Sequence, residues 1–406
     1  MLRDKLNRLS GHIVGPESGA DDEYRDRYHI AAECLRGEIC ARDEGTFVKI
    51  VTDFDPVYRH GEIALGDLDR TVPYRSGHFM SEMAETVYDP GNLLFFDMET
   101  TGLGGSGTVA FLIGFGSVTP EGFQVRQYFL PDYPDEAAML ETLRSEIDEK
   151  TIIVSYNGKT FDMPILRDRM IINRVERNLT FADHVDLLHS TRRLFRRRIG
   201  SCSLGNIERE VLGFHRVDDL PGELVPPVYF NWLATSDTEL LNKVVEHNLY
   251  DIVSLYFLLH HLSVLMENPS VEMREADDML SLVRVMEKRR EHGAIPRLLE
   301  QCEPALWDER RFDVLMHLAL AYKRTGQIDR AVLIWRKITA TTASETFFAR
   351  IELAKYFEHR RRDIASALAH TMAAEPICPS ILSFETDLER RLRRLRKKQG
   401  SPESPV

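Results

Sequence analysis

The clearest hydrophobic pattern in this chain lies between residues 93 and 155. Apolar runs at 93–99, 109–118 and 123–130 are separated by segments that contain glycine and proline, which predicts three strands, the last two joined by a hairpin turn. Residues 135–150 carry apolar side chains at helical spacing, and 151–155 form a short apolar strand. A strand hairpin followed by alternating helix and strand predicts an α/β fold with a mixed sheet flanked by helices.

Further along the chain the pattern predicts helices and one long loop. Pro164 suits the first turn of a helix that continues to about residue 173. Residues 217–234 contain three prolines and a glycine and are predicted to form a long loop. A capping box that begins at Ser236 predicts the start of a long helix, and its largely apolar stripe includes His247 and Asp251.

The two ends of the chain differ in character from its middle. Residues 1–90 are predicted to form an N-terminal extension that is partly β and packs on the α/β domain at 91–268. Residues 269–398 are rich in arginine and glutamate and are predicted to be helical, and 399–406 are expected to be a disordered tail.

The helical region contains an internal similarity. Residues 320–331 resemble residues 353–365 at an offset of 33 to 34 residues. This offset is the period of tetratricopeptide helix pairs, so the region is predicted to be a tetratricopeptide-like repeat that could bind a protein partner.

The composition is typical of a soluble globular protein of two or three domains. Of 406 residues, 43% are hydrophobic and 29% are charged. The five cysteines include no Cys-x-x-Cys pair, which favours a reducing cytoplasm and argues against a zinc site. The N-terminus lacks the apolar core of a signal peptide, and two histidines interrupt the most apolar stretch, 252–266, so no membrane span is expected.

Four carboxylates are candidates for chemistry. Asp97 and Glu99 lie two residues apart on a predicted strand and would share one face, where two buried like charges require a cation, most simply a divalent metal ion. Asp162 lies near a predicted helix start, and Asp251 lies one helical turn after His247. Each also has a plain structural explanation: a solvated strand, a helix cap and an intrahelical pair between His247 and Asp251.

A basic run contrasts with the net charge of −12. Five arginines fall within seven positions, namely Arg192, Arg193, Arg196, Arg197 and Arg198. Because the overall charge would not hold a polyanion, a nucleic-acid partner would need such a local patch. Charge patterning alone fits a solvated helix face equally well.

Three segments, in this order, resemble the motifs of the DEDD group of RNase H-like 3′–5′ exonucleases. They are Asp97-Met98-Glu99-Thr100-Thr101-Gly102-Leu103, Asn157-Gly158-Lys159-Thr160-Phe161-Asp162 and His247-Asn248-Leu249-Tyr250-Asp251. The segments 184–193 and 218–222, with the helical repeats that follow, resemble the bacterial YprB-type RNase H-like family. The resemblance extends over residues 90–265, more weakly before them and only at the level of repeats after them.

The resemblance implies an RNase H-like fold and a nuclease that uses two Mg²⁺ or Mn²⁺ ions on DNA or RNA with a free 3′ end. By the same resemblance, Asp97 would bridge both ions and Asp162 would support the second ion. Glu99 and Asp251 would hold the ion on the nucleophile side. His247, which stands at the spacing that the group uses for tyrosine, would orient or deprotonate the attacking water.

Other motif residues are expected to contact the substrate. Thr100, Thr101 and Leu103 would form a floor for the 3′ end, and Leu103 and Phe161 would wedge against terminal bases. Asn157 would contact a sugar or phosphate. Core packing explains Leu103 and Phe161 equally well, and two other functions stay open at this point: a catalytically inactive scaffold that binds a protein partner, and a structure-specific endonuclease.

Overall fold

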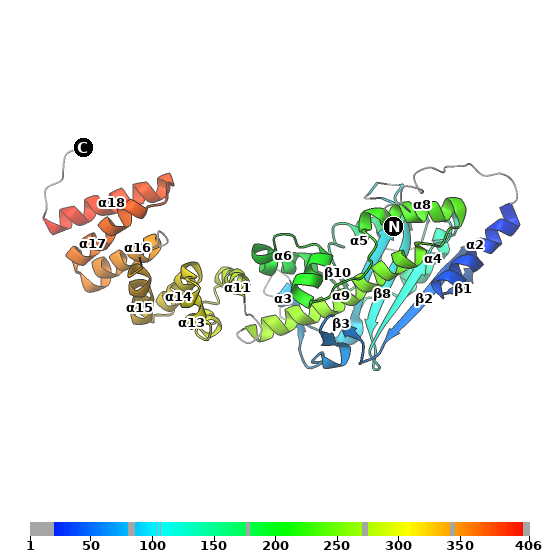
Figure 1. Ribbon diagram of the computed structural model, residues 1–406, viewed down its shortest axis with the longest axis horizontal. Helices are drawn as coiled ribbons and strands as arrows, with labels where there is room; N and C mark the ends of the chain where they lie inside the picture. The colour runs from blue at the N-terminus through cyan, green and yellow to red at the C-terminus, as the bar shows by residue number, and fades with distance from the viewer. Residues whose placement is uncertain are drawn as a thin grey trace. The chain divides into compact units, whose positions relative to one another are not determined.

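The computed structural model describes residues 20–79, 86–102, 104–105, 107–175, 179–269, 275–341 and 346–400. They form two compact units, each with a buried apolar cluster (Figure 1). The sheet unit comprises Met1–Arg192 and Ile199–Glu267, and the helical unit comprises Arg193–Arg198 and Asn268–Val406. Of the predicted disordered tail, residues 401–406 lie outside the described residues.

The sheet unit is built on a seven-stranded mixed sheet with the order β1-β2-β9-β8-β7-β10-β11. Neighbouring strands from β1 to β7 are antiparallel, whereas β10 is parallel to both β7 and β11. This confirms the mixed sheet that the hydrophobic pattern predicts. The strands are β1 (Glu38–Arg42), β2 (Gly45–Phe54), β7 (Leu93–Thr100), β8 (Ala110–Val118), β9 (Phe123–Phe129), β10 (Ile152–Ser155) and β11 (Asp183–Asp186).

The stretch predicted as an N-terminal extension contributes to this sheet. Strand β2 pairs with β9 from Val48–Phe129 to Phe54–Phe123, and β1 pairs with β2 at the edge. The same stretch contains helix α2 (Ala20–Leu35), helix α3 (Ser76–Phe79) and four short strands: β3 (Arg59–His60), β4 (Ile63–Ala64), β5 (Tyr74–Arg75) and β6 (Val87–Tyr88).

Helices flank the sheet, and the long helix α9 (Leu241–Glu267) runs across its central strands (Figure 1). Gly114 of β8 permits this close packing, because a Cβ there would lie 2.5 Å from Asn248 Oδ1 and would also overlap Ile252. The other helices of the unit are α4 (Glu136–Ser145), α5 (Asp162–Ile172), α6 (Leu187–Ile199), α7 (Leu204–Ile207) and α8 (Val225–Thr235).

The prediction of a long loop over residues 217–234 is wrong, because α8 occupies much of this stretch. Two of the prolines lie in the first turn of the helix, where proline loses no hydrogen bond. Tyr229 and Trp232 are buried, and their side chains donate hydrogen bonds of 2.9 and 3.0 Å to the backbone carbonyls of Leu130 and Pro131. Packing of these side chains therefore stabilises a helix in a stretch whose prolines had predicted a loop.

The predicted capping box at Ser236 is also wrong. Ser236 has a φ of 56° and ends α8, since its N–H donates to the carbonyl of Trp232. Helix α9 begins five residues later at Leu241, whose N–H donates to the carbonyl of Thr238 at 3.1 Å. Two helices joined by a short turn thus replace the predicted loop and single helix.

The helical unit confirms the predicted all-helical C-terminal region. Helices α14 to α18 each pack on the next helix along the chain. The repeat predicted at 320–331 and 353–365 falls on the pairs α14–α15 and α16–α17. The helices are α11 (Ala276–Lys288), α12 (Ile295–Leu299), α13 (Glu303–Asp308), α14 (Phe312–Arg324), α15 (Ile328–Thr339), α16 (Phe347–Tyr356), α17 (Ile364–Ala374) and α18 (Leu382–Gln399), with a π-helical turn, η7 (Phe357–Arg361), after α16.

One helix of the described chain, α9, is long and apolar enough to cross a membrane when judged by length and composition. Of its most apolar window, 67% is buried inside the protein. A core helix of a soluble protein satisfies the same criteria, and α9 packs on the sheet as such a helix does.

Candidate active site

Strand β7 directs Asp97 and Glu99 toward helix α9. Alternation along the strand places both on the same face as Phe95, whose ring lies 5.3 Å from that of Tyr256 on α9. Asn248 of α9 donates a 2.8 Å hydrogen bond from Nδ2 to Asp97 Oδ2. The two strand carboxylates therefore face the helix that carries the third motif.

A buried amide relay fixes this contact. Gln127 of β9 donates from Nε2 to Asn248 Oδ1 at 2.8 Å and to the carbonyl of Val245 at 2.9 Å. Because the Asn248 carbonyl accepts from Gln127, its amide nitrogen is turned toward Asp97. We did not predict Gln127 or Asn248 as site residues, and the available signal was an amide within an apolar strand and an amide on the apolar stripe of a helix.

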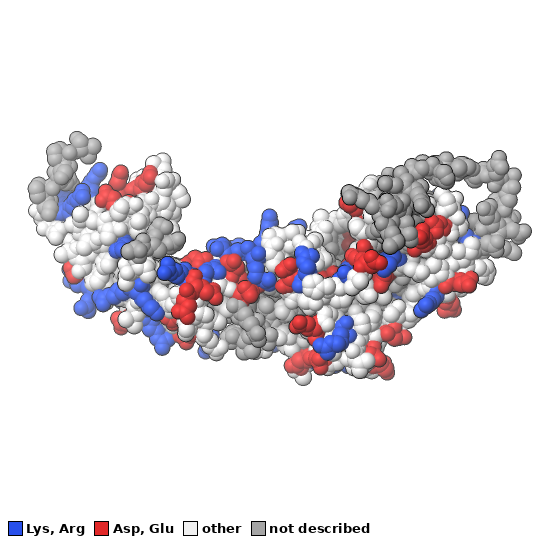
Figure 2. Space-filling model, viewed as in Figure 1, with Lys and Arg blue, Asp and Glu red and all other residues white. Residues whose placement is uncertain are grey.

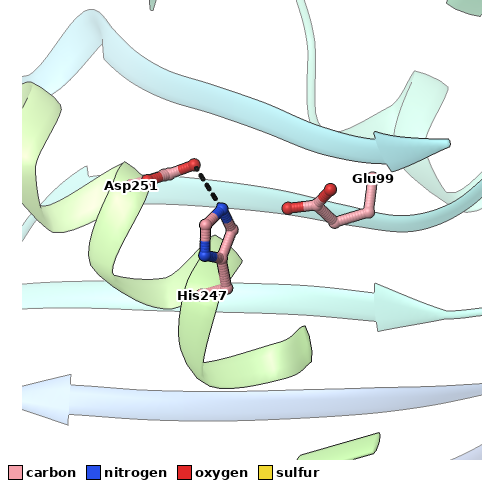
Figure 3. A group of neighbouring side chains, drawn as sticks. All are labelled: Glu99, His247 and Asp251. Atoms are coloured by element: carbon pink, nitrogen blue, oxygen red, sulfur yellow. Dashed lines mark ion pairs between the residues drawn. The ribbon is translucent and has the colours of Figure 1, made fainter. Parts of the chain in front are cut away.

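Glu99, His247 and Asp251 meet beside α9 (Figure 3). One ligand atom from each residue lies within 4.8 Å of the others. His247 Nε2 is 3.7 Å from Asp251 Oδ2, so the intrahelical pair exists within a group that could also hold a metal ion. Asp97 and Asp162 are not members of this group of three, but both carboxylates act on Glu99 or Asp251 electrostatically.

Arg216 is a buried cation at the site that the sequence analysis missed. Its side chain is 8% exposed and ion-pairs with Asp251 and with Glu208, the latter at 2.5 Å. It also contacts His247, with 3.3 Å between Nη1 and Nδ1. Burial lowers the pKa of Arg216, but Asp251 and Glu208 outweigh this effect and raise the pKa above its ordinary value. Arg216 lies outside the three motifs, so motif spacing gave no signal for it.

Glu208 accepts from Nη2 of Arg216, the same nitrogen that contacts Asp251, and from Nε at 2.8 Å. Its side chain is 1% exposed and accepts hydrogen bonds from Arg216 and Ser254. Ser254 is also 2.9 Å from Nε2 of His60, a fully buried histidine whose pKa burial lowers to about 3. The site is thus supported by residues from the N-terminal stretch as well as from α9.

His247 has a second carboxylate partner in Asp219. His247 Nδ1 lies 2.9 Å from Asp219 Oδ1, in a segment between η4 (Glu208–Leu212) and α8. Burial lowers the pKa of His247, but Asp251, Glu99 and the hydrogen bond to Asp219 outweigh it and raise this pKa above its ordinary value. With Nδ1–H donated to Asp219, Nε2 faces Asp251; it carries a proton in the imidazolium that the raised pKa favours and a lone pair only in the neutral ring.

The carboxyl groups of β7 have strongly shifted pKa values. Burial, followed by repulsion from Asp251, raises the pKa of Asp97 well above its ordinary value. Burial also raises the pKa of Glu99 to about 7, although the nearby His247 and Arg216 oppose the shift. The charged forms of these carboxylates are therefore disfavoured, and the cations among the described residues do not offset the effects of burial and mutual repulsion.

Asp162 lies at the start of α5 and is 6% exposed. Burial, with Asp186 and Asp251 as further causes, raises its pKa to about 7. Asp186 of β11 accepts hydrogen bonds from the backbone N–H groups of Asn157 and Lys159, at 2.9 and 3.2 Å. We did not predict Asp186, which shapes the turn that carries the second motif.

Asn157 occupies the left-handed backbone region, with a φ of 68°, and its side chain is exposed. Phe161 is half-buried and packs on the main apolar cluster of the unit, which favours the core-packing interpretation of its role. Thr100 donates to the carbonyl of Gly102 at 2.7 Å, and Thr101 Oγ1 accepts from the N–H of Val109 at 3.0 Å. These hydrogen bonds order the turn after β7.

Leu103 lies outside the described residues.

The predicted arginine patch is divided between the two units. Arg192 and Arg196 are exposed on α6, and Arg193 is half-buried. Arg197 and Arg198 instead form ion pairs within the helical unit, with Asp277 at 2.7 Å and Asp278 at 2.8 Å. Arg197 and Arg198 therefore have structural partners among the acids of the helical unit.

Comparisons with known proteins agree with this architecture. Residues 94–263 match the family model RNase_H_2, described as RNase_H superfamily. The chain is also 33% identical over 417 residues to a protein of Bacillus subtilis (strain 168) named "Uncharacterized protein YprB", an alignment that covers 98% of this chain and 100% of that relative. The RNase H-like fold predicted for the sheet unit is confirmed. The chain belongs to the same family as this full-length relative, and its sheet unit is an RNase H superfamily domain.

Proposed function

We propose that the sheet unit is a metal-dependent 3′–5′ exonuclease. The observation that carries the proposal is the gathering of Asp97, Glu99, Asp162 and Asp251, from three separate chain segments, beside His247. The RNase H superfamily domain supports a nucleic-acid substrate for the same site.

The residues fit a divalent cation. Among the described residues, no lysine or arginine forms an ion pair with Asp97, Glu99 or Asp162, although burial and mutual repulsion raise the pKa of each of them. Carboxylate oxygens are the ligands that Mg²⁺ and Mn²⁺ prefer. Asp97 would hold both of two ions, Glu99 and Asp251 the first ion, and Asp162 the second.

Two such ions, when bound, make a water nucleophilic and neutralise charge on the attacking and leaving oxygens. The protein residues supply orientation and a proton acceptor. Asp219 holds His247 through Nδ1, which leaves Nε2 to accept a proton from the attacking water. The relay from Gln127 through Asn248 holds Asp97 in one orientation.

The substrate end is proposed to lie over the turn after β7, where Thr100 and Thr101 order the backbone. Asn157 is exposed next to Asp162 and is proposed to contact the terminal nucleotide. Arg192 lies close enough to Tyr156 to lower the pKa of that tyrosine. Because Tyr156 precedes Asn157, Arg192 is near the proposed site of the terminal nucleotide, which supports a role for it in binding phosphate. None of the five cysteines, all of which lie among the described residues, forms a disulfide, which fits the proposed cytoplasmic location.

A degradation assay tests the proposal. Full-length protein with Mn²⁺ or Mg²⁺ should shorten a 5′-labelled oligonucleotide stepwise from its 3′ end, and Asp97→Asn should not. Single-stranded DNA, duplex DNA and RNA define the preferred substrate, and a circular single strand should resist cleavage because it has no end. Cleavage of the circle would favour the endonuclease alternative, and inert protein on every linear substrate would contradict the proposal.

A further inference from the structure

The two parts of the chain differ strongly in charge. Residues 1–267 contain 27 Lys and Arg against 43 Asp and Glu, whereas residues 268–406 contain 25 against 21. Figure 2 shows acidic side chains predominating over the sheet unit and basic side chains gathered in several clusters over the helical unit. A polyanion is repelled by the sheet unit as a whole, so a basic surface elsewhere on the chain would help to retain it.

A concentration of positive charge in the helical unit surrounds Glu358. This buried carboxylate of η7 forms ion pairs with Arg391 at 3.2 Å, Arg394 at 2.7 Å and Lys398 at 2.8 Å, all from α18. Three positive charges of α18 thus surround Glu358, while the neighbouring acid Asp387 pairs with Arg390 at 3.0 Å. The next residues along η7, Arg360 and Arg361, are exposed and add to the excess.

An aromatic cavity adjoins this charge. It has a volume of about 340 Å³, lies between α16 and α18, and is lined by Phe347, Phe348, Ile351, Lys355, Phe384, Asp387, Leu388, Arg390, Arg391 and Arg394. Phe348 is 47% exposed, and its ring lies 5.5 Å from that of Phe384. Arg391 and Arg394 belong both to this cavity and to the Glu358 cluster, so the aromatic and basic groups form one continuous surface.

We propose that this surface of the helical unit binds single-stranded nucleic acid, with a base against Phe348 and Phe384 and the backbone phosphates along Arg390, Arg394 and the arginines of η7. The exposed ring of Phe348 and the half-buried ring of Phe384, beside a row of cations, suit a ligand that repeats a flat base and a phosphate. An acidic protein segment would match the charge but offers no comparable series of flat groups. The choice of nucleic acid rests on the proposed nuclease function, and the binding site itself is separate from the carboxylate cluster.

Binding is tested without cleavage, in full-length Asp97→Asn protein with EDTA, by fluorescence anisotropy of labelled 20-residue oligothymidine and oligouridine. Phe348→Ala should weaken binding about tenfold by removing a stacking surface. The double variant Arg360→Gln/Arg361→Gln should weaken it about tenfold at low salt and flatten the dependence of log Kd on log salt. Leu333→Ala and Arg297→Gln, which change an exposed apolar residue and an exposed arginine on α15 and α12, are matched controls that should bind normally.

Unchanged oligonucleotide affinity in both the Phe348→Ala and the double-arginine protein would overturn the proposal. Tighter binding of 20-residue polyglutamate than of either oligonucleotide would also overturn it, in favour of an acidic protein segment. Melting curves identify any variant that fails to fold. If Phe348→Ala does not fold, the affinity of the Arg360→Gln/Arg361→Gln protein tests the proposal by itself. Cleavage by the wild-type protein is measured separately: its absence, with variant-sensitive binding, would contradict only the exonuclease proposal.

Discussion

Glu358 in the helical unit is buried and the carboxylates of β7 are half-buried, but the two sites differ more in the charge of their surroundings. Burial alone would raise the pKa of Glu358, yet hydrogen bonds from Arg394 and Lys398 lower it to about 2. Around Asp97 and Glu99, burial and neighbouring carboxylates raise the pKa of each group. The helical unit neutralises Glu358 with its own side chains, whereas no lysine or arginine among the described residues forms an ion pair with Asp97 or Glu99, which leaves room for a cationic ligand.

The largest expected effect comes from removing Asp97, a carboxylate that forms no ion pair with a lysine or arginine of the described chain. Asp97→Asn should lower kcat about 10³-fold or more, because both metal positions depend on this residue. The same change should not lower the melting temperature in EDTA, since it removes repulsion. Asp168→Asn, at an exposed acid on α5, is the control and should keep full activity. If Asp97→Asn lowered the melting temperature but kept full activity, the proposed difference between Asp97, a metal-binding acid, and Glu358, a structural acid, would be contradicted.

The converse experiment removes the neutralised carboxylate. Glu358→Gln should destabilise the helical unit by about 2 kcal/mol, because three cations lose a charged hydrogen-bond partner. Faster hydrogen exchange in α16 and α18, with unchanged exchange in β7 and β8, would assign the loss to this unit. Glu375→Gln, at an exposed position after α17, should leave exchange unchanged.

The next largest effect is expected at His247, which lies beside Glu99 and Asp251. Asp219→Ala should lower kcat about tenfold with little change in KM, because His247 loses the acceptor that fixes its Nδ1–H. Asp218→Asn changes the exposed neighbouring acid and should leave both constants unchanged. Equal losses in the two variants would point to a disturbed segment rather than to orientation of His247.

The raised pKa of Glu99 is tested by measuring the free energy of unfolding as a function of pH. The folded-state pKa of Glu99, about 7, lies above its ordinary value of 4.5, so the charged form opposes folding above pH 4.5. In EDTA, Glu99→Gln should therefore be more stable than wild type at pH 8, and this advantage should shrink by about 1 kcal/mol at pH 6 as Glu99 takes up a proton. Burial lowers the pKa of His60 to about 3 and that of His184 to about 4; both histidines are present in the two proteins, so their titration cancels in the difference. A constant difference across this pH range would contradict the raised pKa.

The smallest effect is expected at the exposed arginine of α6. Arg192→Glu should weaken oligonucleotide binding about threefold at low salt and lower the salt dependence of binding, with kcat unchanged. Arg42→Gln, at the exposed edge strand β1, is the control. A full loss of cleavage in Arg192→Glu would show that this arginine does more than hold phosphate.

The sheet was predictable because its strands are apolar runs bounded by strong turn signals. The prolines of α8 were misleading because, by residue type alone, a proline in the first turn of a helix cannot be distinguished from one in a loop. The packing of Tyr229 and Trp232, which decides the matter, depends on strands far away in the sequence.

The candidate site likewise contains residues that the sequence predicts and residues that it does not. The strand and helix acids stand in recognisable motifs, so the sequence pointed to them. Arg216 and Gln127 are joined to those motifs only through the fold: Arg216 is 35 residues from Asp251, and Gln127 is 121 residues from Asn248. Contacts of this kind follow no local period, and a single sequence therefore does not reveal them.

The absence of a side chain at Gly114 has a consequence for the order of synthesis. It lets α9 lie directly on the strand beside Asp97, so the site closes only when this helix has docked. Asn248, the partner of Asp97, is made 151 residues later. A nascent or truncated chain that ends before α9 carries the strand acids without Asp251 or His247, so it cannot assemble the proposed nuclease beside the nucleic acid from which it is being translated.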